Sequence, residues 1–193
     1  MNTTRLEAFS DGVLAIIITI MVLEMKVPHG AAWQDLQPLI PVFLSYALSF
    51  IYIGIYWGNH HHLMHSVTKV TSGILWANLN LLFWLSLIPF STAWMGENHF
   101  APNTLALYSV SMLLPAIAYY ILQSIVMKNH LHPDAFNEAH RKQNIKGRIS
   151  LAAYSLSILF AFYLPVITGI IIIGAALIWL VPDKNFENSA GSE

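Results

Sequence analysis

The first apolar segment of the chain, from Arg5 to Leu23, reads RLEAFSDGVLAIIITIMVL. It is long enough to cross a bilayer as a helix, which takes about 20 mostly apolar residues. Three charged residues, Arg5, Glu7 and Asp11, nevertheless lie near its start. A charged side chain at the centre of a membrane helix costs about 2.5–3.5 kcal/mol on insertion scales. We therefore expect these charges to be paired, to face a wet cavity or to lie at the interface, and we expect the functional site to include this segment.

The composition is that of an integral membrane protein. Of the 193 residues, 56% are hydrophobic and 10% are charged, whereas about 25% of the residues of a soluble domain are charged. The lack of cysteine excludes disulfides, thiolate metal sites and cysteine nucleophiles. The net charge of −1 says nothing about nucleic acid, but no basic patch interleaved with aromatic residues appears, and we expect no nucleic-acid partner.

Six apolar stretches approach the length of a transmembrane helix. They cover about residues 6–25, 38–57, 70–95, 102–127, 149–164 and 166–182. The last two are nearly continuous, but Pro165 removes a backbone donor and disfavours helix in the residue before it. A tight hairpin at Tyr163-Leu164-Pro165 is therefore favoured over one kinked helix. We predict an all-α integral membrane protein with six transmembrane helices in a single domain, 1–193.

The basic residues predict the orientation of these spans. With six spans, the two termini and the 2–3 and 4–5 connections share one side of the membrane. That side holds eight basic residues: Arg5, Lys69, Lys128, Arg141, Lys142, Lys146, Arg148 and Lys184. The other side holds Lys26 alone. Because basic connections stay in the cytoplasm, we expect both termini there, with residues 128–148 as a basic cytoplasmic loop and 183–193 as a short cytoplasmic tail.

One face of the first span carries a stripe of large apolar residues. Ile16, Ile20 and Leu23 follow each other at i, i+4 and i+7, and Thr19 stands beside them. Spacing alone favours packing of this stripe against neighbouring helices over a place in a pore. Ser10 and Asp11 begin to support a place in a pore, because a helix with an acid about two turns inside its apolar stretch faces protein or water.

A histidine cluster follows the second span in the run Trp57-Gly58-Asn59-His60-His61-His62-Leu63-Met64-His65. Imidazole is a common metal ligand, and His61 and His65 are spaced to share one helical face. The carboxylate that usually completes such a site is absent nearby, and only one from another helix, such as Asp11, could supply it. We expect no bound metal, and instead expect polar contacts between this cluster and Arg5, Ser10 and Asp11.

The third span contains two asparagines, Asn78 and Asn80, which need partners in a low-dielectric environment. We expect them to connect helices, and Pro89 to kink this span near its outer end. Enzyme signatures are missing: the chain has no nucleophile elbow, no phosphate-binding glycine loop and no paired carboxylates within a span. We predict that the protein is not an enzyme.

The first span closely resembles the signature of the transmembrane protein 175 family of potassium channels. The match follows the pattern Arg-x-x-x-Phe-Ser-Asp-Gly-Val-x-Ala-Ile-x-x-Thr, continued by Val22-Leu23-Glu24-Met25. The runs Trp57-Gly58-Asn59-His60-His61 and Asn78-Leu79-Asn80-Leu81-Leu82-Phe83 are also similar to that family. The resemblance covers the whole chain, which looks like the single-unit prokaryotic form.

This resemblance implies a homotetramer in which the first helix of each subunit lines one central pore. It places the narrowest hydrophobic ring at Ile16, further pore-facing turns at Ile20 and Leu23, and a threonine layer at Thr19. Arg5, Ser10 and Asp11 match the family's polar network at the cytoplasmic end, to which we add His60, His61 and Asn78. No Thr-Val-Gly-Tyr-Gly filter is present.

We therefore expect a modestly potassium-selective cation channel in the inner (plasma) membrane, with K⁺ as permeant ion and no cofactor. Its hydrophobic gate would be formed by Ile16, Ile20 and Leu23, and its selectivity by Thr19 and Ile16. The alternative is a proton- or metal-coupled secondary transporter that uses the His60–His65 cluster and Asp11.

Overall fold

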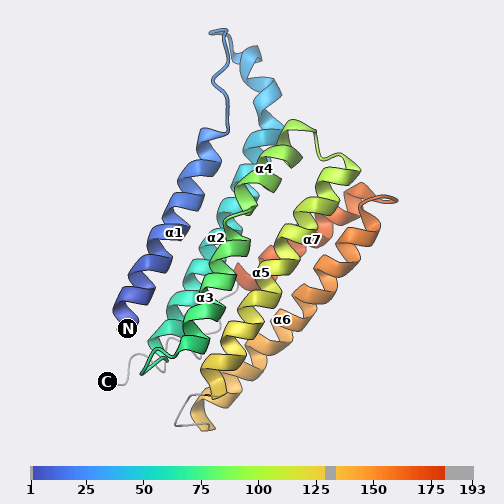
Figure 1. Ribbon diagram of the computed structural model, residues 1–193. Helices are drawn as coiled ribbons and strands as arrows, with labels where there is room; N and C mark the ends of the chain where they lie inside the picture. Colours follow the sequence, from blue (N-terminus) through green and yellow to red (C-terminus); the bar gives the residue numbers. More distant parts are fainter. Residues whose placement is uncertain (1, 129–133, 181–193) are drawn as a thin grey trace.

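The structure, a computed structural model, describes residues 2–128 and 134–180; of residues 134–143 it describes the backbone alone. The described residues form helices and no strand. The elements are α1 (Thr3–Leu23), the short 3₁₀ helix η1 (Trp33–Leu39), α2 (Ile40–His65), α3 (Ser72–Leu85), α4 (Ile88–Glu97), α5 (Pro102–Lys128), α6 (Asp134–Phe160) and α7 (Pro165–Leu180). Most of them run side by side in one bundle (Figure 1).

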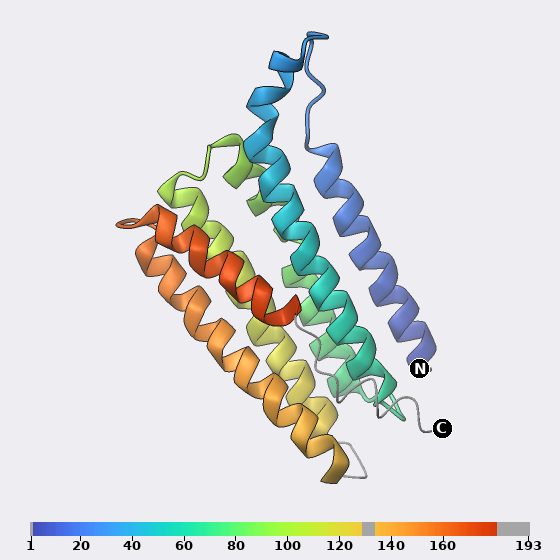
Figure 2. The same cartoon turned by 180° about the vertical axis from the view of Figure 1, so that it is seen from behind.

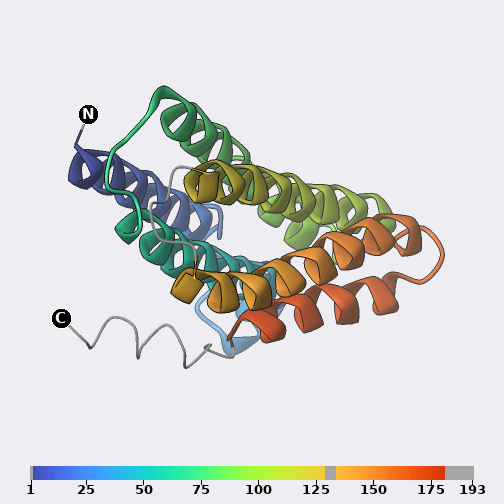
Figure 3. The ribbon, with the colours of Figure 1, turned by 90° about the horizontal axis from the view of Figure 1, so that it is seen from below.

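Among the described residues, four helical segments are long and apolar enough to cross a membrane. They are Thr3–Leu23, Trp33–His65, Ser72–Glu97 and Pro102–Lys128. The helix α7 is apolar but shorter, with 16 residues. It lies obliquely across the bundle, in contact with α2, α5 and α6 (Figure 2), and from below it is seen on the outside beside α6 (Figure 3).

The second helix is longer than the predicted span 38–57. It continues to His65, where the backbone N–H of Ser66 caps it by bonding to Leu63 and Met64. Residues 58–65 are mostly polar, so they lie beyond the apolar span, but they contain no proline and continue the helix. The histidine cluster consequently occupies the last turns of α2 and does not lie on a loop.

The predicted span 70–95 is divided into α3 and α4. Helix α3 ends at Leu85 and α4 begins at Ile88, with Pro89 in its first turn. Because proline has no N–H to donate to the carbonyl four residues earlier, the helical hydrogen-bond ladder stops here. The predicted kink is therefore a break between two helices.

The predicted basic loop 128–148 is largely helical, which corrects our expectation for this segment. Helix α6 starts at Asp134 and continues through the expected span 149–164 to Phe160. The reason is that alanine, glutamate and lysine have good helix propensity, so a segment rich in such residues extends a helix beyond the membrane. The predicted hairpin at Tyr163–Pro165 coincides with the turn between α6 and α7. The predicted tail 183–193 lies outside the described residues.

Buried hydroxyl groups connect the helices in the upper part of the bundle. The Ser49 hydroxyl of α2 lies 2.7 Å from that of Thr92 on α4 and 2.9 Å from that of Tyr108 on α5. Tyr52 donates to the backbone oxygen of Ile172 on α7 at 2.6 Å. Because an unsatisfied polar group is costly in a membrane interior, these contacts specify how the helices pack.

Candidate functional site

Helix α1 lies at one edge of the bundle (Figure 1), where it packs mainly against α2, α3 and α4. Its inward face is buried and consists of Leu6, Ser10, Leu14, Ile17 and Met21. Its outward face is open: Ile16 is 57% exposed, Ile20 41% and Leu23 78%. The three residues that were predicted to line a pore therefore share a face that the described residues leave exposed.

Thr19 lies on the same exposed face. Its hydroxyl donates back into its own helix, where the oxygens of Ile16 and Ala15 lie 2.9 and 3.1 Å away. A hydroxyl has one hydrogen and two lone pairs. Since the hydrogen is directed to the helix backbone, the oxygen can present a lone pair outward, as a ligand for a cation requires.

A groove runs beside this face, between α1 and α4. It has a volume of about 440 Å³ and is lined on the α1 side by Ile16, Ile20 and Glu24, and on the α4 side by Pro89 and Phe90. The groove is mainly apolar, and it leaves one side of the Ile16 and Ile20 side chains without a packing partner among the described residues.

A buried chain of hydrogen bonds connects α1 to α3 and α2. The Ser10 hydroxyl donates to the backbone oxygen of Leu6 at 2.9 Å, and Asn78 Nδ2 donates to Ser10 Oγ at 2.9 Å. Asn78 Oδ1 lies 2.7 Å from His60 Nε2. Because an amide oxygen only accepts, His60 must carry its hydrogen on Nε2. Its Nδ1 has no partner within the described part of the chain.

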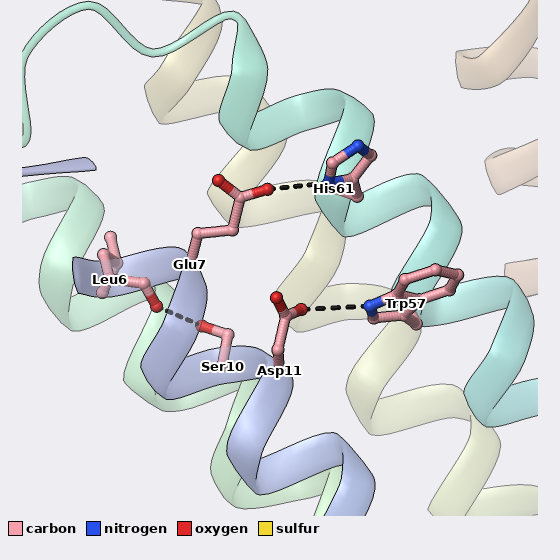
Figure 4. A network of polar contacts seen from close by, with 6 residues as sticks. All are labelled: Leu6, Glu7, Ser10, Asp11, Trp57 and His61. Atoms are coloured by element: carbon pink, nitrogen blue, oxygen red, sulfur yellow. Dashed lines mark hydrogen bonds and ion pairs between the residues drawn. The ribbon is translucent and has the colours of Figure 1, made fainter. Parts of the chain in front are cut away.

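A second set of contacts connects α1 laterally to α2, as Figure 4 shows. Glu7 Oε1 lies 2.7 Å from His61 Nδ1, and Asp11 Oδ1 accepts a hydrogen bond from Trp57 Nε1 at 3.0 Å. On each helix the two residues are four positions apart, so they lie one above the other on one face. The helices run antiparallel, and the two pairs form successive rungs between them.

The structure thus divides the predicted polar network into two parts. Ser10, His60 and Asn78 meet in the buried chain, whereas Asp11 and His61 belong to the lateral rungs. Arg5 joins neither part: it is exposed, and its side chain makes no hydrogen bond or ion pair with the residues that the structure describes.

Sequence reasoning missed two members of the lateral rungs, Glu7 and Trp57. The matching i, i+4 spacings of Glu7 with Asp11 and of Trp57 with His61 were the signal that could have found them. The ligand atoms of Glu7, His61 and His65 also lie within 4.8 Å of one another, close enough to share one cation after small adjustments.

A known protein family matches the part of the chain that contains these contacts. The family model described as endosomal/lysosomal potassium channel TMEM175 matches residues 5–89. This range includes every residue of the two polar networks and the exposed face of α1. The first span and the histidine and asparagine runs are thus the part of the chain that the family model identifies.

Similarity to individual proteins extends over nearly the whole chain. A potassium channel of Chryseobacterium sp. (strain P1-3) is 53% identical over 190 residues, which is 98% of each chain. A potassium channel of Streptomyces collinus is 33% identical over 168 residues, 82% of each chain. The crystal structure of a lysosomal potassium-selective channel TMEM175 homolog from Chamaesiphon minutus matches with a TM-score of 0.77 and 28% identity, covering 92% of this chain and 96% of that one. The chain therefore belongs to the TMEM175 family.

Proposed function

We propose that the protein is a potassium channel whose permeation path is lined by α1. The observation that carries the proposal is the exposed face of α1, where Ile16, Ile20 and Leu23 stand open on a helix long enough to span a membrane. The relatives named potassium channels, similar over almost the full length, support this function. An ion-channel family also agrees with the prediction that the chain is not an enzyme.

The path requires several copies of the chain. Because α1 lies at the edge of the bundle, one chain cannot surround an axis with this face (Figure 1). We propose a homotetramer in which four α1 helices meet around the axis and the grooves beside Ile16 and Ile20 are covered by neighbouring copies. The membrane topology in this proposal has six spans, with α6 and α7 as the last two and both termini in the cytoplasm of a bacterial cell.

The gate in this proposal is a hydrophobic constriction. Four Ile16 side chains around one axis form a ring from which water is expelled, and such a ring can block ions by dewetting. Ile20 and Leu23 add further apolar rings on successive turns. The ring widens when the C-terminal half of α1 tilts or rotates, while the buried hydrogen bonds of Ser10 hold the N-terminal half in place.

Selectivity is assigned to Thr19 and Ile16. Four outward-facing Thr19 oxygens next to the narrow ring can replace part of the hydration shell of a passing ion. Potassium gives up its water more readily than sodium, so this arrangement favours potassium. The preference should be modest, because the chain has no filter of backbone carbonyls of the kind that replaces the whole hydration shell.

The alternative, a proton- or metal-coupled transporter, receives less support from the geometry. Such a transporter needs its histidines and Asp11 to form one relay. Here His60 is buried against Asn78, whereas His61 faces Glu7 and Asp11 is bonded to Trp57. His60 therefore belongs to a different set of contacts from His61 and Asp11, and all three side chains are already engaged in contacts between helices.

Recording from purified protein in a planar bilayer, with potassium on one side and sodium on the other, tests the proposal. A channel gives unitary currents whose reversal potential shifts toward that of potassium and which need no counter-ion. Transport that saturates and depends on a proton or metal gradient would support the transporter, and absence of any current would overturn the channel.

A further inference from the structure

We infer that Glu7, His61 and His65 form a binding site for a divalent transition-metal ion such as Zn²⁺, which connects α1 to α2. The inference concerns residues outside the proposed permeation path. Its test measures metal binding, so that its outcome does not depend on whether the channel function is correct.

The three side chains already lie close together in the structure. His61 and His65 lie one turn apart on the last turns of α2, with ring centroids 4.4 Å apart, and Glu7 reaches them from α1 with its carboxylate 2.7 Å from His61 Nδ1. The ligand atoms all lie within 4.8 Å of one another. Metal–ligand bonds of about 2.0–2.2 Å place tetrahedral ligands about 3.4 Å apart. Rotations of side chains alone can therefore close the site.

The donor set determines the class of ion. Two imidazoles and one carboxylate, with a water in the fourth position, form a combination typical of zinc sites. Imidazole also favours copper and nickel, whereas magnesium and calcium require mostly oxygen ligands. Potassium, the ion of the proposed channel, is likewise unsuited to nitrogen ligands, so the two sites take different ions.

The surroundings of His61 suit a metal ligand. The Trp57 indole stacks on its ring, with centroids 6.2 Å apart and planes 23° apart, and Trp57 is itself held by Asp11. Contacts around a ligating imidazole help to orient its ring. The Asp11 carboxylate, one turn from Glu7, adds negative charge that favours a cation.

The three residues differ in their exposure to solvent. The side chain of Glu7 is 20% exposed and that of His61 is 42% exposed, whereas His65 is open to solvent. A cation can enter past His65 and then bind the two more protected ligands. The bound ion would replace the His61–Glu7 contact as the connection between α1 and α2, and so stabilise the packing of the two helices.

Isothermal titration of Zn²⁺ into purified protein without a polyhistidine tag tests the site. Because the chain has nine histidines, the informative quantity is the difference between variants. We expect His65→Gln and Glu7→Gln to weaken the tightest Zn²⁺ binding at least about tenfold, since each removes a ligand. The matched control is His62→Gln, which changes a histidine of the same run outside the site and should leave that binding unchanged.

Thermal melting with and without Zn²⁺ gives a second readout. The wild-type protein and His62→Gln should melt at a higher temperature with Zn²⁺, because an ion that binds only the folded state stabilises it. His65→Gln should lose this shift. That substitution removes an exposed side chain, so we expect the variant to fold even if Glu7→Gln does not. Equal Zn²⁺ affinity of the wild type and His65→Gln, or equal losses in His65→Gln and His62→Gln, would overturn the inference.

Discussion

Asn78 donates a hydrogen bond from Nδ2 to the Ser10 hydroxyl at 2.9 Å, so that a buried amide of α3 holds the pore helix α1 of the proposed channel. The same amide accepts from His60 on α2 through its oxygen. Three helices thus meet at one side chain that is fully buried. The exposed Ile16 lies less than two turns above Ser10 on α1, so this contact fixes the base from which the proposed gate moves.

Replacing Asn78 with alanine should destabilise the protein strongly. The substitution leaves Ser10 and His60 without their partner, and an unsatisfied buried polar group costs about 1–3 kcal/mol. Thermal melting in detergent measures the effect. Asn80→Ala is the matched control, because Asn80 is exposed two residues further along the same helix, and it should change the melting temperature little. Similar losses in both variants would contradict the role of Asn78.

Asp11→Ala should reduce the fraction of assembled tetramer on a sizing column. Asp11 joins α1 to α2 through Trp57, and without this bond the exposed face of α1 is held less firmly in the orientation that neighbouring copies need. Asp11→Asn retains an oxygen that can accept from the indole, so it should assemble more fully than the alanine variant. If Asp11→Ala assembled normally but conducted no current, the residue would belong to the permeation path.

Ile16→Asn should raise potassium leak and weaken selectivity in liposome flux measurements. A ring of four amides holds water where a ring of isoleucines expels it. The same substitution at Ile170 serves as control, since this isoleucine of α7 is also exposed, by 64%, but lies on a helix remote from α1. Unchanged flux in Ile16→Asn would count strongly against the gate.

Thr19→Val should lower the preference for potassium over sodium while leaving the fold intact. Valine has nearly the same shape as threonine but offers no oxygen to a passing ion, and the lost hydroxyl bonds lie within α1 itself. Reversal potentials under mixed ionic conditions measure the preference. Thr19→Ser, which keeps the hydroxyl, should retain it. A valine variant with wild-type selectivity would remove Thr19 from the selectivity mechanism.

Gly96→Ala should destabilise the contact between α4 and α2. A Cβ at this position would lie 2.5 Å from Ser45 Oγ and 2.7 Å from the Val42 Cα, and such overpacking costs about 1–3 kcal/mol. Gly54→Ala on α2 is the control, because nothing lies within 4 Å of the added carbon. Alanine also favours helix over glycine by about 1 kcal/mol. Thermal melting should therefore show a loss for the first substitution and no loss for the second.

The sequence was sufficient for the family, for the helical class and for the stripe on α1. Hydrocarbon length and helical periodicity are local properties, so Ile16, Ile20 and Leu23 could be assigned to one face without knowledge of their neighbours. The motif from Arg5 to Thr19 then indicated the family that the whole-length comparisons confirm. The ends of the helices were harder to predict, because the hydrophobic pattern marks where a membrane ends and not where a helix ends. This is why α2 and α6 extend beyond their predicted spans.

The partners of the polar residues were decided by the tertiary structure alone. Composition indicates that Ser10, Asn78 and the histidines need partners, but which group meets which depends on the register between antiparallel helices. That register places Glu7 opposite His61 and Asp11 opposite Trp57, and leaves Arg5 exposed. A shift of one residue turns a helical side chain by about 100°, so the pairing follows from packing over the whole length of the helices. Local patterns in the sequence thus suffice to identify the kind of protein and the exposed face of its first helix, whereas the residues that anchor that face follow from the packing of the helices.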